Sequence, residues 1–311
     1  MTEFALKPLI GTNPLGVLAA LGAFDVAHRL LPDIPVTLHW SGGLIPHPVL
    51  SGPEHVEHLI ALIDTDRQRW ASSTVLTGPA GEAPSDLKLE SNRIRDWIQE
   101  ASVSSHPEDL KLLHALVSED AVAGTGDSKP THLHFTAGQQ KFLSMVRILN
   151  QELTVDQLRE ALIGPWRYES ELPVLGWDSR GERIYALRGF SPSGDKKTGV
   201  PGADWLGFLG LRFFPVATTP SGALLTSCCS RRWKTGTLTW PLWDRPLSER
   251  AIVSMLAGPL TKLTASEQAE RGIATLLTAP IRRTDQGGYG SFGPSAPATT
   301  PTSARRSRRI S

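Results

Sequence analysis

An apolar run rich in alanine and glycine follows the loop at residues 11–13. Leu15, Leu18, Gly22 and Val26 recur at helical spacing. The alanines between them keep the surface small enough for another element to pack closely against it. We therefore expect a helix that belongs to the core, around which the rest of the chain has to be arranged.

The start of this helix has two local signals. Asn13 can cap it, and Pro14 stands at the first helical position, where its missing N–H costs nothing. A Gly-rich helix start can also cradle a phosphate. However, residues 11–16 lack the Lys-Ser/Thr of a P-loop and the three glycines of a dinucleotide fingerprint. We favour a helix N-terminus that is simply buried over a nucleotide site.

The remaining pattern predicts an α+β fold with a helix-rich N-terminal lobe at residues 1–170 and a β-rich basic lobe at residues 171–278. Alternation and the Ser41-Gly-Gly43 turn predict a β-hairpin between residues 35 and 50. Thr154 and Gln157 have the spacing of a capping box at the start of a helix. Helices are expected at residues 54–70, 87–103, 108–117 and 154–163, and strands at residues 175–177, 184–187, 213–216, 224–228 and 237–240.

From residue 279 the chain consists largely of Gly, Ser, Pro, Thr and Arg. We expect residues 279–311 to form a disordered tail, because such a segment buries too little apolar surface to offset its ordering entropy. Its six arginines and one aspartate favour either a nonspecific attraction to nucleic acid or a purely solubilising role.

Thr136 and Gln139 have the same capping-box spacing ahead of a helical face formed by Phe142, Val146 and Leu149. Two polar residues, Gln140 and Lys141, would then lie near the exposed first turn. They would either contact a phosphate or a partner backbone, or be solvated as in any ordinary helix cap.

Charge divides the chain unequally. Residues 1–179 hold 13 Lys and Arg against 23 Asp and Glu, whereas residues 180–250 hold 11 against 5. This asymmetry predicts that the second half faces phosphates or an acidic partner.

Two clusters could provide that surface. In the first, Lys196 and Lys197 follow Gly194 in a polar loop, supported by Arg188, which suits a phosphate cradle. The second combines cations with an aromatic ring, which can stack bases while following phosphates. It consists of Arg231, Arg232, Trp233 and Lys234. The alternative for both clusters is a core edge at which arginines keep their charged groups in water.

The sequence favours no catalytic or cofactor chemistry. No nucleophile is paired with a base by a recognisable motif, and His132 and His134 have no third metal ligand in view. Cys228 and Cys229 are adjacent, and we expect them to be free thiols in a reducing compartment. With neither a leader nor an apolar run of about 20 residues, we expect a cytoplasmic protein that does not enter a membrane.

An ordered set of motifs resembles a family of type I-G (formerly I-U) CRISPR-associated proteins, the extension family of the helicase-nuclease. The resemblance covers about residues 6–260 and departs at Leu9-Ile10, where the family more usually has Leu-Asp. The motifs are Leu9-Ile-Gly-Thr-Asn-Pro-Leu-Gly-Val-Leu-Ala-Ala-Leu-Gly22, Asp86-Leu-Lys88, Phe135-Thr-Ala-Gly-Gln-Gln-Lys-Phe-Leu143, Gly164-Pro-Trp-Arg-Tyr168, Leu175-Gly-Trp-Asp178, Tyr185-Ala-Leu-Arg188 and Phe213-Phe-Pro-Val216.

This resemblance implies a non-catalytic component of an antiviral CRISPR interference system. Its partners would be effector subunits and the helicase-nuclease, and the basic half would face DNA or crRNA. Two alternatives remain: a protein–protein adaptor that touches no nucleic acid, and a hydrolase-type enzyme.

Overall fold

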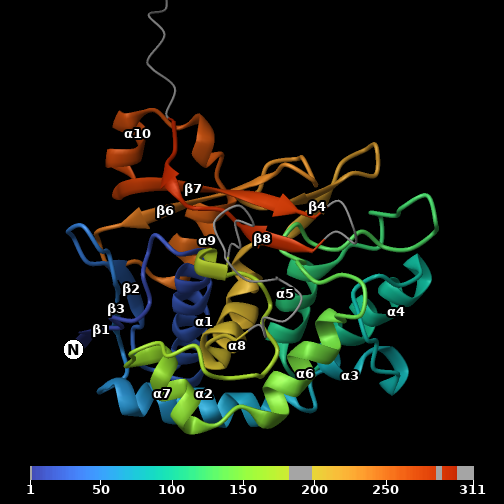
Figure 1. Ribbon diagram of the computed structural model, residues 1–311, viewed down its shortest axis with the longest axis horizontal. Coiled ribbons are helices and arrows are strands. Elements are labelled where there is room, and N and C mark those ends of the chain that lie inside the picture. The colour runs from blue at the N-terminus through green and yellow to red at the C-terminus, as the bar shows by residue number, and fades with distance from the viewer. Residues whose placement is uncertain (1, 182–197, 285–288, 300–311) are drawn as a thin grey trace, which may run out of the picture.

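Two buried helices lie side by side at the centre of the molecule (Figure 1). The computed structural model describes residues 2–181, 198–284 and 289–299. The first central helix, α1 (Pro14–Leu30), is capped as expected, because the Asn13 side chain accepts a hydrogen bond from the Leu15 N–H. The second, α8 (Pro201–Gly210), is buried along its whole length. Sequence analysis expected the first helix in the core and missed the second.

The backbones of α1 and α8 touch at two glycines. A Cβ atom on Gly22 would lie 1.9 Å from the carbonyl oxygen of Leu206, and one on Gly210 would lie 2.0 Å from that of Leu18. Side-chain carbon atoms do not approach backbone oxygen atoms so closely, so only glycine fits at these positions. The contact lets two helices from distant parts of the chain form one central layer.

Other helices surround this pair, and α2, α6 and α7 lie below it in the view of Figure 1. The Thr154–Gln157 capping box at the start of α7 is present, as predicted. The surrounding helices are α2 (Val56–Trp70), α3 (Thr74–Thr77), α4 (Ser91–Ser102), α5 (Pro107–Leu116), α6 (Phe142–Glu152), α7 (Val155–Leu162), α9 (Glu249–Ala257) and α10 (Ala265–Glu270), and the short 3-10 turns are η1 (Pro79–Gly81), η2 (Ser179–Gly181), η5 (Leu211–Phe213) and η6 (Leu260–Lys262).

The predicted N-terminal hairpin is present as β2 (Thr37–Trp40) and β3 (Pro48–Ser51), which pair antiparallel with Leu38 opposite Leu50. A third strand, β1 (Glu3–Ala5), pairs with the other edge of β3. The resulting order is β1-β3-β2.

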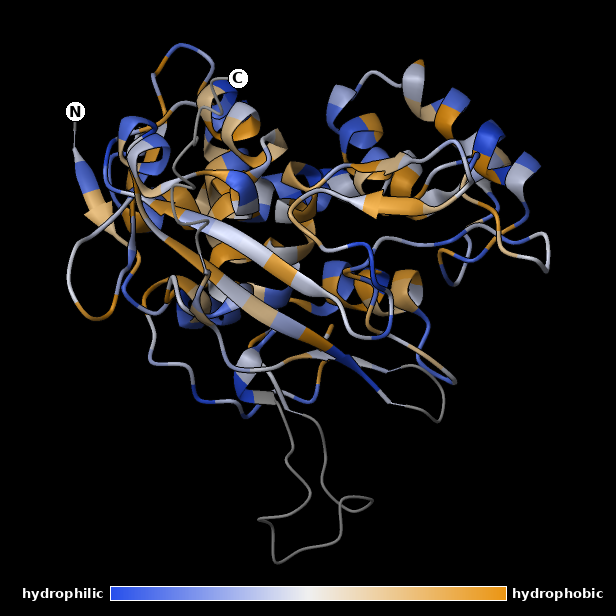
Figure 2. Ribbon diagram, turned by 90° about the horizontal axis from the view of Figure 1, so that it is seen from above, coloured by the Kyte–Doolittle hydropathy of each residue, from blue (hydrophilic) through white to orange (hydrophobic). Residues whose placement is uncertain are grey.

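The C-terminal strands form a larger sheet above the central helices (Figure 1). Strand β7 (Ile273–Arg283) pairs antiparallel with β6 (Thr237–Trp243), β8 (Gly290–Phe292) and β9 (Ala296–Pro297). Seen from above, the two long strands cross the molecule, and polar and apolar residues are interspersed along them (Figure 2). A separate hairpin consists of β4 (Val216–Thr218) and β5 (Leu224–Thr226).

The predicted start of a disordered tail at residue 279 is wrong. Strand β7 continues to Arg283, and Ala279, Ile281 and Phe292 are buried. The apolar residues of β7 extend past residue 279, and Phe292 packs edge-on against Phe135 with ring centroids 4.8 Å apart. Residues 300–311 of the predicted tail lie outside the described residues.

The mixed α+β fold is confirmed, with most helices in the N-terminal part and most strands in the C-terminal part. The strand predicted at residues 175–177 is wrong, since these residues are irregular, and the one at residues 184–187 lies outside the described residues. Phe213 ends a 3-10 turn rather than beginning a strand. Residues of both predicted lobes share one hydrophobic core.

Two tryptophans join the C-terminal sheet to the N-terminal part. The Trp240 indole N–H donates to the Gly11 carbonyl over 2.9 Å, and that of Trp243 donates to the Leu38 carbonyl over 2.6 Å. The Trp243 ring also meets Trp40 edge-on. Both residues are buried, so strand β6 is attached to the start of α1 and to β2.

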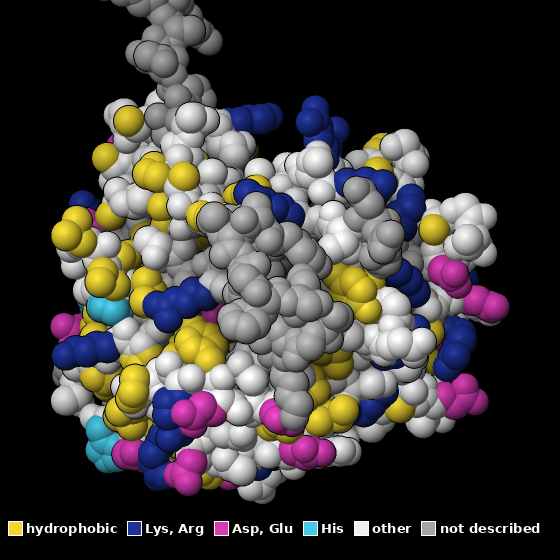
Figure 3. All heavy atoms as spheres, in the orientation of Figure 1, with side chains coloured by type: hydrophobic (Ala, Val, Ile, Leu, Met, Phe, Trp, Pro, Cys, Tyr) yellow, Lys and Arg dark blue, Asp and Glu magenta, His cyan; other side chains and the backbone are white. Residues whose placement is uncertain are grey.

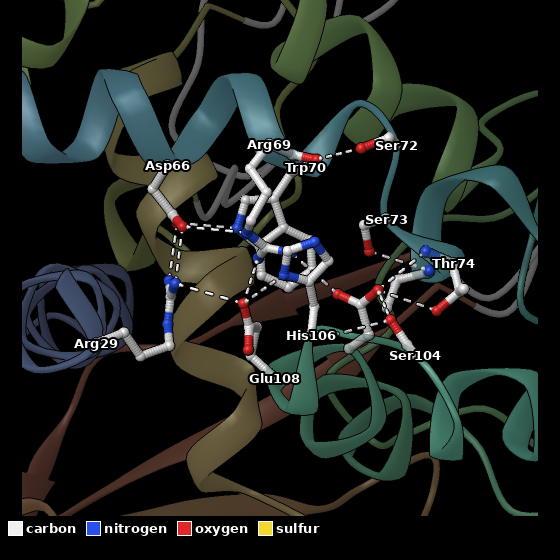
Figure 4. A network of polar contacts seen from close by, with 12 residues as sticks. Arg29, Asp66, Arg69, Trp70, Ser72, Ser73, Thr74, Ser104, His106 and Glu108 are labelled. Carbon is white, nitrogen blue, oxygen red and sulfur yellow. Dashed lines mark hydrogen bonds and ion pairs between the residues drawn. The ribbon is translucent and has the colours of Figure 1, made fainter.

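A network of buried ion pairs connects α1, α2 and α5 (Figure 4). Arg29 binds both carboxylate oxygens of Asp66, over 2.7 and 2.8 Å, and also binds Asp25 over 2.8 Å. Arg69 extends the network to Glu108 and Asp109. Burial alone would raise the pKa of Asp66, but the hydrogen bond and charge of Arg29 hold it below its usual value. These mutually paired groups act as structural ties between the helices.

Asp204 is a buried carboxyl group in the first turn of α8. Its Oδ1 accepts a hydrogen bond from the Leu175 N–H over 3.2 Å, whereas its Oδ2 has no hydrogen-bond partner in the described part of the chain. Burial raises the pKa of Asp204 to about 8, against the Leu175 hydrogen bond and with a contribution from the Asp178 charge. The carboxyl is therefore mostly protonated at neutral pH.

We expect Gly22→Ala or Gly210→Ala to lower the free energy of unfolding by about 3 kcal/mol, because the added methyl forces the two helices apart. This loss is expected even though the higher helix propensity of alanine, taken alone, would stabilise the helix by about 1 kcal/mol. Gly207→Ala in α8, the helix that also contains Gly210, is the matched control. Its Cβ would meet only side-chain atoms, at 3.1 Å or more, so the loss should be smaller. Urea denaturation measures all three; equal stability of the Gly22 and Gly207 variants would contradict the account.

The raised pKa of Asp204 makes the stability of the protein depend on pH. As pH rises from about 4 to 8, the unfolded chain, with an ordinary pKa of 3.8, releases this proton before the folded chain does. The free energy of unfolding should therefore fall over this range. In Asp204→Asn this contribution is absent, so the variant should lose less stability than the wild type between pH 5 and pH 8 in urea denaturation. Asp120→Asn, at an exposed carboxylate, is the control, and parallel pH profiles for wild type and Asp204→Asn would refute the assignment.

Candidate nucleic-acid interface

The second predicted cluster lies in the loop that joins β5 to β6. Arg231, Arg232, Trp233 and Lys234 are all exposed there. Ser230 closes the loop, because its N–H donates to the Thr237 carbonyl and its Oγ accepts from the Thr237 N–H, each over 2.9 Å. A Cβ on Gly236 would lie 2.4 Å from the Arg232 carbonyl oxygen. The loop is therefore tightly folded at its base, and its three cations are exposed.

Arg283, at the end of β7, contacts both the backbone and the aromatic ring of this loop. Its guanidinium carbon lies 3.8 Å from the centroid of the Trp233 ring, and its Nε donates to the Trp233 carbonyl over 3.2 Å. The other guanidinium nitrogens donate to the carbonyls of His132 and His134, both over 2.8 Å. Burial lowers the pKa of Arg283 to about 10, which still leaves it charged at neutral pH. One side chain thus joins the sheet, the loop and residues 132–134.

His132 is buried and packs beside the Trp233 ring. The two ring centroids are 5.5 Å apart, with a tilt of 58° between the rings. The backbone N–H of His132 donates to Thr226 Oγ1 over 2.9 Å, and its Nδ1 lies 3.0 Å from the same oxygen. Burial and the nearby Arg283 charge lower the pKa of His132, so the imidazole is neutral at neutral pH. The positive charge here comes from the arginines and Lys234.

The three cations of the loop are exposed. Within the described part of the chain, no carboxylate forms an ion pair with Arg231, Arg232 or Lys234. On the face shown in Figure 3, several Lys and Arg side chains lie in the upper part, near the C-terminal strands, whereas along the left, lower and right parts Lys and Arg are mixed with Asp and Glu.

The other predicted contact residues do not form part of this described site. Arg188, Lys196 and Lys197 lie outside the described residues. Gln140 and Lys141 lie near the first turn of α6, because the helix begins at Phe142 with Lys141 as the residue directly before it. Lys141 is exposed and Gln140 is half-buried.

The predicted capping box at Thr136 and Gln139 does not form. The Thr136 hydroxyl lies 3.1 Å from His134 Nε2 instead. Gly138 takes a positive φ of 59°, which turns the chain away from a helix at the point where the box requires one. Residues 132–135 lie beside β8 instead, where the Gly290 N–H donates to the Phe135 carbonyl over 2.9 Å.

The two histidines also do not form a metal pair. His134 Nε2 lies 2.7 Å from the Asp86 carboxylate, whereas His132 contacts Thr226. Within residues 2–181, 198–284 and 289–299, no group of three His, Cys, Asp or Glu side chains is arranged to hold a metal ion.

Residues of this chain pack against the N-terminus of α1 and satisfy the side chain of Asn13. Asn13 Nδ2 donates to Asp178 Oδ1 over 2.9 Å, and Asn13 Oδ1 accepts from the Ser179 N–H over 3.2 Å. A Cβ on Gly16 would lie 2.4 Å from the Ile10 carbonyl oxygen. The glycine there serves close packing, and the buried helix N-terminus favoured from sequence is the arrangement observed.

Sequence reasoning missed Arg283 and the contribution of His132. Arg283 follows the strand-like apolar positions of β7, but the surrounding Gly, Ser and Pro content hid that signal. The approach of residues 132–134 to the loop is a long-range contact with no local signature.

No protein-family model matches this chain, and no curated protein sequence is significantly similar to it. Among the described helices, none has both the length and the apolar character required to span a bilayer.

Proposed function

We propose that this chain is a non-catalytic component of a type I-G CRISPR interference system. In this proposal it acts in the cytoplasm, contacts DNA or crRNA through the β5–β6 loop, and couples the effector complex to its helicase-nuclease. The observation that carries the nucleic-acid contact is the set of three exposed cations around Trp233, which have no ion-pair partners in the described part of the chain. The link to CRISPR interference rests on the ordered motifs that resemble the helicase-nuclease extension family.

The geometry supports phosphate binding rather than simple solvation at this loop. Arg283 holds the loop backbone and the Trp233 ring together, so the cations extend from an ordered base. A backbone of phosphates that contacts these cations releases its condensed counterions, which provides a salt-dependent driving force. The acidic N-terminal part would then face protein partners.

The two cysteines and His134 do not form a nucleophile–base pair. Burial raises the pKa of Cys228 to about 12 and also raises that of Cys229, which disfavours the thiolate required of a nucleophile. His134 is bound to Asp86 and Thr136, and neither contact activates a Ser or Cys.

The adaptor alternative is favoured by one observation. The tip of the β2–β3 hairpin exposes Leu44 completely and Ile45 by 55%. Adjacent exposed aliphatic residues suit a protein contact, and a protein that binds only other proteins would use such a tip without the basic loop.

The combined variant Arg231→Ala, Arg232→Ala and Lys234→Ala tests the nucleic-acid contact. At about 0.1 M salt we expect it to bind oligonucleotides roughly 10- to 100-fold more weakly, and the slope of log affinity against log salt should decrease in magnitude by about 2 to 3 units. Fluorescence anisotropy with single-stranded DNA, duplex DNA and RNA at several salt concentrations measures both quantities.

The matched control removes three exposed cations elsewhere, through Lys7→Ala, Lys88→Ala and Arg95→Ala. It has the same net charge and should retain near-normal affinity. Equal losses in both triple variants would reduce the effect to net charge and contradict a site at the loop. If the wild type binds no nucleic acid, the adaptor alternative is supported, and pull-downs with the helicase-nuclease should then depend on Leu44.

A further inference from the structure

Trp233 differs from the other tryptophans of the chain. Seven of the nine are buried and Trp166 is half-buried, whereas 38% of Trp233 is exposed. An exposed indole offers apolar area that a ligand can cover. The exposed residue is also the one that stands among three cations, which points to a ligand both flat and negatively charged.

The fold holds this indole in place before any ligand arrives. The Arg283 guanidinium stacks on the ring at 3.8 Å and donates to the Trp233 carbonyl, while the His132 ring lies beside it. The closed base of the loop, at Ser230 and Thr237, restricts the backbone. Because the ring is already oriented, a ligand that stacks on it loses little additional side-chain entropy on binding.

An unpaired nucleotide matches these features. Its base offers an apolar, aromatic face to the indole, and its phosphates fit Arg231, Arg232 and Lys234. In a duplex the bases stack on one another, so a duplex reaches the loop only through its phosphates. An acidic peptide would likewise use the cations and leave the indole without a stacking partner.

We propose that Trp233 is a stacking platform for an unpaired base, so that the loop binds single-stranded nucleic acid in preference to duplex. This inference rests on the proposed function, since it specifies the nucleic acid that the basic loop takes. Arg283 is then a positioning residue that fixes the platform, and the three exposed cations hold the flanking phosphates.

The test compares three probes of equal length: a single strand, the same strand with abasic sites at its central positions, and the duplex. Abasic sites retain the phosphates and remove the stacking bases. With wild-type protein we expect roughly tenfold weaker binding to the duplex and to the abasic strand, as expected for the loss of one stacked base. Trp233→Leu should lose roughly tenfold in affinity for the intact strand and little for the abasic strand. Trp233→Phe keeps a ring and should retain most of the affinity.

The outcomes separate this inference from the proposed function. If wild-type protein binds intact, abasic and duplex probes equally, while the triple cation variant binds all three weakly, the stacking platform is wrong and the basic interface stands. If wild-type protein binds none of the probes, the proposed function fails. Unchanged affinity of Trp233→Leu for the intact strand also overturns the platform. The abasic comparison uses unmodified protein, so it decides the matter even if a variant fails to fold.

Discussion

The rest of the structure depends on the contact between the backbones of α1 and α8 at Gly22 and Gly210. A helix near the N-terminus and a helix about 180 residues later lie so close that neither glycine has room for a methyl group. This contact joins the two predicted lobes around one hydrophobic core. Arg212, which follows α8 directly, strengthens the junction by pairing with Asp25 of α1 and Glu249 of α9.

This central layer positions the basic loop through a series of specific contacts. Trp240 and Trp243 attach β6 to the backbone beside α1 and in β2. Strand β7 pairs along β6 and ends at Arg283. That arginine fixes the loop that precedes β6. Trp233 and the cations around it are therefore displayed by a sheet that the core holds in place, as expected of a preorganised binding surface.

Local sequence signals predicted the structure correctly where the interactions that they require lie within a few residues of one another. Asn13 and Thr154 each cap the helix that follows, and alternation located the N-terminal hairpin. Helix α8 was missed because its three glycines give it little intrinsic preference for helix, and its conformation depends on tertiary packing against α1. The capping box predicted at Thr136 and Gln139 has the correct spacing but does not form. Gly138 turns the chain with a positive φ, and the Thr136 hydroxyl contacts His134 instead. Of the candidate site, Arg231 to Lys234 could be named from composition, whereas Arg283 and His132 join them through contacts that no short window contains.

The central claim is that nucleic acid meets this protein at Trp233. Photo-crosslinking of a single strand that carries iodouracil at defined positions, followed by mass-spectrometric identification of the modified residue, tests it most directly. The account predicts a dominant cross-link at Trp233, in the loop between β5 and β6. Cross-links concentrated at half-buried Trp166 or on the helical N-terminal part, with Trp233 unmodified, would contradict it.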